Sequence, residues 1–170
     1  AVRSAGAGEI IALSSRTMEK AREKAAEWNV PKAYGNHAEL LADEDVNIVY
    51  ISSVNAQHYP MAKAAILAGK HVVCEKPCTT SAENTRELFA LAREKGVFLM
   101  EAEKMLLLPT LEEVRRRIVA GDLGQIYMAE MAHSFAASYN GWMFDEAAGG
   151  GPLLSSGIYA VQLIQHFFGP

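Results

Sequence analysis

The amino-acid sequence predicts an α/β protein, in which a doubly wound, mostly parallel sheet is followed by the start of an α+β domain. Short apolar runs alternate with amphipathic segments of helical length from residue 9 to residue 121. This order is typical of strands joined by right-handed helical crossovers. Past Gly124 the pattern changes to one longer extended run and a final apolar helix. A globular chain is indicated, since 50% of the 170 residues are hydrophobic and 21% are charged.

The strands of the first domain are predicted from apolar runs with turn residues at their ends. They are residues 9–14, 47–52, 71–74 and 97–100, with a brief extended piece at 33–34.

Helices are predicted between these strands from apolar residues at helical spacing. They are residues 18–29, 37–42, 56–68, 81–95 and 109–120. Thr17 can cap the first, Thr80 and Glu83 form a capping box for the fourth, and Pro109 suits the first turn of the last. Pro31 breaks the first helix, and Gly69, Gly96 and Gly121 end later ones.

The second half begins with an extended run at residues 126–135. Side chains at every second position would share one face: Tyr127, Ala129, Met131, His133 and Phe135. A loop with Trp142 follows, and Gly149-Gly150-Gly151 opens an apolar helix at residues 153–168. The expected domains are residues 1–104, a connecting helix at 105–123, and a partial second domain at 124–170.

A dinucleotide-binding sheet usually starts with a strand and a G-x-G-x-x-G turn. Here Gly6-Ala7-Gly8 precedes a strand, so a turn between a helix and a strand is the better interpretation. The first strand of a Rossmann-like fold is therefore expected upstream of Ala1. The absence of an initiator Met also suggests that the chain begins inside a longer protein.

Composition argues against several classes of partner. A net charge of -4 disfavours nucleic acid, and the basic run Arg115-Arg116-Arg117 adjoins two glutamates. No run reaches the roughly 18 apolar residues of a membrane helix, and the amino end does not resemble a signal peptide. Cys74 and Cys78 fit neither a zinc site nor a disulfide framework. We expect reduced thiols, no metal and a cytoplasmic location.

Polar residues that follow the strands form a candidate cofactor site, because ligands of open α/β sheets bind at the carboxyl ends of strands. Ser14-Ser15-Arg16 lacks the acid that grips a ribose hydroxyl, and its guanidinium suits a 2′-phosphate, which favours NADP over NAD. Ser53, Asn55 and His58 follow the next strand and open a helix. Asn55 and His58 are expected either to contact the ligand or only to cap and flank that helix.

Glu75-Lys76-Pro77 directly follows a buried strand, so the Lys76 ammonium is expected in the ligand crevice. Tyr159 follows the triple glycine and could exchange a proton if it lay beside Lys76. A cation about 4 Å away would lower the phenol pKa by about 3 units at an effective dielectric near 20, and desolvation would oppose this. His133 and Trp142 are expected either to line a substrate pocket or to pack in the interior.

In this order and spacing, the motifs resemble those of the glucose–fructose oxidoreductase, inositol dehydrogenase and rhizopine-catabolism (Gfo/Idh/MocA) family. The resemblance is strongest to its dimeric dihydrodiol dehydrogenase branch and covers a middle portion of the family's longer sequence. The segments that carry it are Ser14-Ser15-Arg16, residues 55–58, Glu75-Lys76-Pro77, Glu101-Ala102, Pro109, residues 121–124 and residues 149–159.

The resemblance implies an NAD(P)-dependent dehydrogenase acting on a sugar, polyol or related hydroxy compound. Lys76 would be the family's active-site lysine, binding the substrate oxygen and lowering the phenol pKa, and Tyr159 would exchange the hydroxyl proton. Hydride would pass between the substrate carbinol carbon and nicotinamide C4. The second domain would carry an open antiparallel sheet, shape the substrate pocket and form a homo-oligomer, a dimer or tetramer.

Two positions depart from the family pattern. Ser155 stands where many members have aspartate, and it can hydrogen-bond a substrate hydroxyl but cannot act as a carboxylate base. Leu106 stands where arginine is common. The alternatives are a non-catalytic dinucleotide sensor of the same fold, or a truncated fragment without activity.

Overall fold

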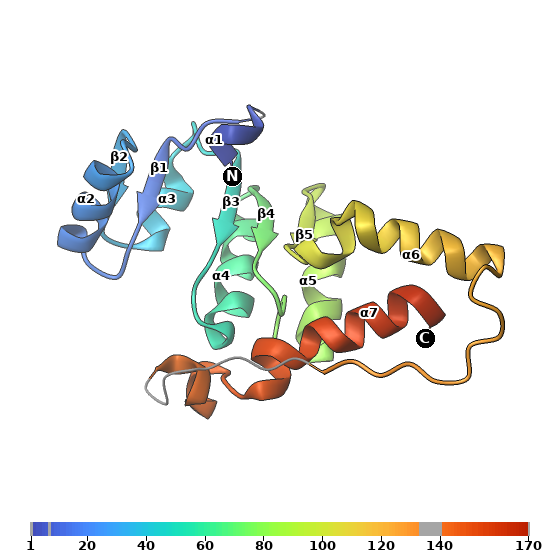
Figure 1. Ribbon diagram of the computed structural model, residues 1–170. Coiled ribbons are helices and arrows are strands. Elements are labelled where there is room, and N and C mark those ends of the chain that lie inside the picture. The colour runs from blue at the N-terminus through green and yellow to red at the C-terminus, as the bar shows by residue number, and fades with distance from the viewer. Residues whose placement is uncertain (1, 7, 133–140, 170) are drawn as a thin grey trace.

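The computed structural model describes residues 2–6, 8–132 and 141–169 and has the expected α/β architecture (Figure 1). Its strands are β1 (Ala12–Ser14), β2 (Lys32–Tyr34), β3 (Ile48–Ile51), β4 (His71–Cys74) and β5 (Leu99–Glu101). All strand pairs are parallel, and Ile51 lies opposite Cys74, which lies opposite Glu101 on its other side. The carboxyl ends of β3, β4 and β5 are therefore in register.

Helices connect and cover these strands. They are α1 (Val2–Ala5), α2 (Met18–Glu27), α3 (His37–Ala42), α4 (Asn55–Leu67), α5 (Ala82–Lys95), α6 (Pro109–Ala120) and α7 (Ile158–Phe168). Short 3-10 turns are η1 (Lys104–Leu107), η2 (Trp142–Phe144) and η3 (Glu146–Ala148), and η4 (Leu153–Gly157) is a wider π-type turn. In the part of the chain that the structure describes, no helix is long and apolar enough to cross a membrane.

The described strands form two sheets, which is compatible with the predicted doubly wound sheet lacking its first strand. β1 pairs with β2, and β3, β4 and β5 form the second sheet in that order. β1 and β3 lie in different sheets and share no ladder hydrogen bonds (Figure 1). The α/β class and the parallel direction of the strands are confirmed.

The main core lies between the second sheet and the helices α4 and α5. Ile51 and Val72 from the strands pack with Ile66 of α4 and Leu88 of α5, and all four side chains are at most 1% exposed. Burying each of these side chains contributes about 1.5–3 kcal/mol. This core fixes the strand ends from which the candidate site is built.

Capping explains where the helices begin and end, with one correction. Thr17 caps α2 by accepting a hydrogen bond from Lys20 N, as predicted. Gly96 and Gly121 end α5 and α6 in the left-handed conformation, at φ angles of 67° and 79°. The predicted capping box of Thr80 and Glu83 is wrong, because α5 begins one residue later and Ser81 accepts from Asn84 N.

The long strand predicted at residues 126–135 is absent from the described portion, residues 126–132. A strand is held by ladder hydrogen bonds to a neighbour, and no described strand pairs with this segment. It instead runs as extended chain along α7 (Figure 1). The predicted helix at residues 153–168 is confirmed as η4 followed by α7.

Candidate active site

β1, β3 and β4 point in the same direction, and the loops after β3 and β4 run toward the start of α7, whereas the loop after β1 leads to α2 (Figure 1). These loops hold the three polar motifs that the sequence analysis placed at strand ends. Ligands of parallel α/β sheets bind at this edge.

The loop after β1 carries Ser14, Ser15 and Arg16. The Ser14 hydroxyl lies 2.8 Å from Nδ1 of His37, and Ser15 N donates to Tyr34 O at 3.1 Å. Arg16 is exposed at the surface. Hydrogen bonds to His37 and Tyr34 therefore fix this loop, and the exposed Arg16 guanidinium is accessible to an anionic group.

The loop after β3 is held by His58, whose side chain is 1% exposed. Its Nδ1 lies 2.7 Å from Pro77 O and its Nε2 lies 3.1 Å from Ser53 O. His58 thus joins the loop after β3 to the loop after β4 from inside the protein. The sequence had suggested ligand contact or a place on the first helical turn, and the structure shows a buried structural link.

Asn55 is also directed into the protein. It is the first residue of α4, which follows the N-cap residue Val54, and its amide nitrogen donates to Gly149 O at 2.8 Å. Gly149 has a φ of +76°, and a Cβ atom there would lie 2.9 Å from both Ala56 N and Asn55 Cβ. The absence of a side chain at Gly149 therefore allows the triple-glycine segment to pack against the start of α4.

The structure brings together the two residues predicted to handle a proton. The Lys76 ammonium donates to Ser155 O and lies 4.5 Å from the centre of the Tyr159 ring, over its face. Lys76 comes from the loop after β4, and Tyr159 lies in the first turn of α7.

The pKa shifts differ from the expectation for Tyr159. Burial raises the pKa of its phenol, and the carboxylates of Glu103 and Glu75 raise it further. Burial lowers the pKa of the Lys76 ammonium. The predicted lowering of the phenol pKa by Lys76 is therefore wrong for this arrangement, in which desolvation is the largest effect on both groups.

Glu75 is part of a polar contact at the end of β3. The Tyr50 hydroxyl donates to its Oε1, and Lys76 N donates to its Oε2 at 3.3 Å. Burial and then this hydrogen bond raise the pKa of Tyr50 to about 12. Glu75 thus fixes the backbone that carries Lys76 relative to β3.

Two acidic residues near Lys76 had no predicted role. Glu101 accepts hydrogen bonds from Cys78 N at 2.7 Å and from Gln162 Nε2 at 2.9 Å. Glu103 is 5% exposed, and its Oε1 accepts from Met105 N at 2.9 Å. Its Oε2 is buried without a hydrogen-bond partner among the described residues, and burial raises the pKa of this carboxyl. The sequence marked Glu101 only as part of the motif Glu101-Ala102.

The predicted substrate residues occupy separate positions. The Ser155 hydroxyl donates to Gly151 O at 2.7 Å, one turn earlier. Trp142 begins η2 and is 40% exposed. His133 lies outside the described residues.

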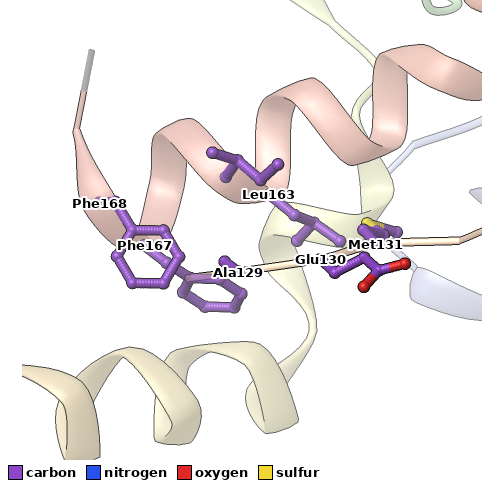
Figure 2. Close-up of a pocket in the computed structure, with 7 residues that line it drawn as sticks. Ala129, Glu130, Met131, Leu163, Phe167 and Phe168 are labelled. Atoms are coloured by element: carbon purple, nitrogen blue, oxygen red, sulfur yellow. The ribbon is translucent and has the colours of Figure 1, made fainter. Parts of the chain in front are cut away.

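An apolar groove lies farther along α7, between the helix and residues 129–131 (Figure 2). It is lined by Ala129, Glu130, Met131, Leu163, Ile164, Phe167 and Phe168. None of the predicted site residues that the structure describes lines it, so it is separate from the Lys76–Tyr159 pair.

Comparison with known proteins agrees with this arrangement. Residues 1–103 match an oxidoreductase family described as having an NAD-binding Rossmann fold, and residues 111–170 match the GFO/IDH/MocA C-terminal domain. Trans-1,2-dihydrobenzene-1,2-diol dehydrogenase of Mus musculus is 38% identical over 161 residues, which are 95% of this chain and 48% of that protein. The enzyme of the same name from Homo sapiens is 35% identical over the same share of each chain. This chain spans about half the length of these curated relatives.

Solved structures give the same result. KijD10, a 3-ketoreductase from Actinomadura kijaniata in complex with NADP and TDP-benzene, matches with a TM-score of 0.83 at 29% identity. That match covers 95% of this chain and 50% of KijD10. An NAD-binding oxidoreductase from Klebsiella pneumoniae matches with a TM-score of 0.74 at 32% identity, over 93% of this chain and 44% of the other. The chain therefore belongs to the Gfo/Idh/MocA family of oxidoreductases.

Proposed function

We propose that the natural protein containing this chain is an NAD(P)-dependent oxidoreductase that interconverts a CH–OH group and a carbonyl in a sugar, polyol or dihydrodiol-like substrate. The observation that carries this proposal is the placement of the Lys76 ammonium over the Tyr159 ring at the carboxyl edge of the sheet. The dihydrodiol dehydrogenases and the 3-ketoreductase among its relatives support this substrate class.

The residues at this edge fit a dinucleotide. The exposed guanidinium of Arg16, beside Ser14 and Ser15, offers charged and hydroxyl donors to a ribose 2′-phosphate, so NADP is preferred over NAD. Residues 53–55 and 75–77 would bound the site from the next two loops, with His58 holding these loops together. When bound, the nicotinamide supplies the hydride donor or acceptor.

The protein's own residues would then handle the substrate oxygen. Lys76 donates a hydrogen bond to that oxygen and stabilises the negative charge that develops on it. Tyr159 gives its phenolic proton to the oxygen during carbonyl reduction and takes it back during oxidation. The raised pKa of Tyr159 keeps the phenol protonated at neutral pH, which suits the reducing direction.

The test uses the natural full-length protein. Binding of NADPH and NADH is followed by nicotinamide fluorescence. Turnover is followed by nicotinamide absorbance with trans-dihydrobenzenediol, sugars and polyols and with the matching ketones. We expect tighter binding of NADP and turnover with at least one substrate of this class. Dinucleotide binding without turnover on any member of these panels would contradict the proposal and favour a sensor.

A further inference from the structure

Glu101, the last residue of β5, bridges two segments that are distant in the sequence. Its Oε1 accepts a hydrogen bond from Cys78 N at 2.7 Å, and its Oε2 accepts one from Gln162 Nε2 at 2.9 Å. Hydrogen bonds to an ionised carboxylate are short and about twice as strong as those between neutral groups. One side chain therefore fixes both segments to the end of the sheet.

Each segment carries one member of the proposed proton-handling pair. Cys78 lies two residues after Lys76 in the loop that follows β4 and is 4% exposed. Gln162 lies three residues after Tyr159 on α7, so the two side chains are neighbours on one helix face. The position of Lys76 relative to Tyr159 thus depends on the two arms of the Glu101 bridge.

We propose that Glu101 is a positioning residue that sets the placement of Lys76 against Tyr159. This inference rests on the proposed function, in which those two residues handle the proton. Glu101 does not touch the reacting atoms. Its loss acts by letting the loop and the helix shift independently, and a displacement of about 1 Å in an active site can cost about 100-fold in rate.

The Gln162 side chain makes it possible to remove the negative charge of Glu101 while keeping the hydrogen bonds of the bridge. Its Oε1 is buried and has no hydrogen-bond partner among the described residues. In a Glu101→Gln variant, the new amide can accept from Cys78 N and donate to Oε1 of Gln162 after the latter amide has rotated. The bridge then survives without its negative charge. In Glu101→Leu, both arms are lost.

The experiment compares Glu101→Gln, Glu101→Leu and Gln162→Leu in the natural full-length protein. We expect Glu101→Gln to keep kcat within about 3-fold and Glu101→Leu to lower it about 100-fold, with the dinucleotide Kd within about 2-fold. Gln162→Leu removes one arm and should lower kcat by an intermediate factor. Because Glu101→Leu and Gln162→Leu remove parts of the same bridge, the variant that carries both substitutions should have a kcat no lower than that of Glu101→Leu.

Glu87→Leu is the matched control. Glu87 of α5 also bridges two groups, the Tyr59 hydroxyl at 2.7 Å and the Lys63 ammonium at 2.6 Å, but both lie on α4 away from the site. This variant should lose thermal stability and keep kcat. A wild-type kcat in Glu101→Leu, or losses from Glu101→Leu and Gln162→Leu that multiply, would overturn the proposal.

A second readout does not depend on turnover. Reductive methylation followed by mass spectrometry measures the accessibility of the Lys76 amine, with exposed Lys24 as the internal reference. Glu101→Leu and Gln162→Leu should accelerate labelling of Lys76 relative to Lys24, and Glu101→Gln should not. Unchanged labelling in both leucine variants would overturn the bridge. Wild-type turnover in Lys76→Ala would instead overturn the proposed function and leave the labelling result as the test of the bridge.

Discussion

The Lys76 ammonium makes a cation–π contact with Tyr159, lying over the face of the ring 4.5 Å from its centre. Such a contact contributes about 0.5–2 kcal/mol, more where water is excluded. It joins the loop after β4 to α7, where both residues are partly buried. This partial burial raises the pKa of the phenol and lowers that of the ammonium.

This burial predicts opposite pH dependences for the two reaction directions. The pKa of Tyr159 is raised above its ordinary value of 10.0. Alcohol oxidation needs the phenolate as base and should accelerate into the alkaline range, whereas carbonyl reduction needs the phenol and should not. Tyr159→Phe should lower kcat by about 10²–10⁴ in both directions. The check is kcat against pH for wild type and variant, and an oxidation rate that levels off near neutral pH would be evidence against the assignment.

Glu103→Gln should stabilise the folded protein at neutral pH. The folded carboxyl has a pKa above its ordinary value of 4.5, so its contribution to stability is full below that pH and is lost as pH rises through the folded value. The amide keeps the acceptor for Met105 N and carries no charge. We expect a gain of about 1 kcal/mol in the free energy of unfolding at neutral pH and little difference under acid conditions. Urea titrations at both pH values measure this, and a variant less stable at neutral pH would contradict it.

Gly149→Ala tests the close packing of the triple glycine against α4. The added Cβ would lie 2.9 Å from Ala56 N at a φ of +76°, so both crowding and backbone strain oppose it. Gly124→Ala is the control, because Gly124 has a φ of +66° and no atom within 4 Å of an added Cβ. We expect Gly149→Ala to cost about 1–3 kcal/mol more than Gly124→Ala in denaturant unfolding. Equal losses in the free energy of unfolding for the two variants would mean that backbone strain accounts for the cost and would contradict the close packing at Gly149.

Arg16→Ala tests the choice of dinucleotide. If the guanidinium binds a 2′-phosphate, the variant should lose about 10-fold or more in affinity for NADP and change its affinity for NAD less than about 2-fold. Arg22→Ala, at an exposed position on α2, controls for general loss of positive charge. Fluorescence titrations of wild type and both variants with NADPH and NADH give the Kd values, and an equal loss for the two dinucleotides would remove the preference.

The sequence predicted the elements of the first domain well because their signals are local. The apolar runs of β3 and β4 and the cap at Thr17 can be read within a few residues. The segment at residues 126–132 shows the limit of such signals, since its alternating pattern suits a strand but no described strand pairs with it. Pairing depends on a neighbour that a local pattern cannot supply.

The candidate site was predictable in part. The resemblance placed Lys76 and Tyr159 together, and the structure does the same. The Glu101 bridge and the link from His58 to Pro77 O were not predictable, because each joins loops through hydrogen bonds that exist only after folding. The direction of the Tyr159 pKa shift was mispredicted because the expectation weighed charge above desolvation.

The most direct test of the central claim is single-turnover hydride transfer by Lys76→Ala in the natural full-length protein, measured with the dinucleotide Kd of the same preparation. Our account predicts that the variant binds the dinucleotide within about 3-fold of wild type and transfers hydride at least about 100-fold more slowly. Hydride transfer at the wild-type rate would contradict it.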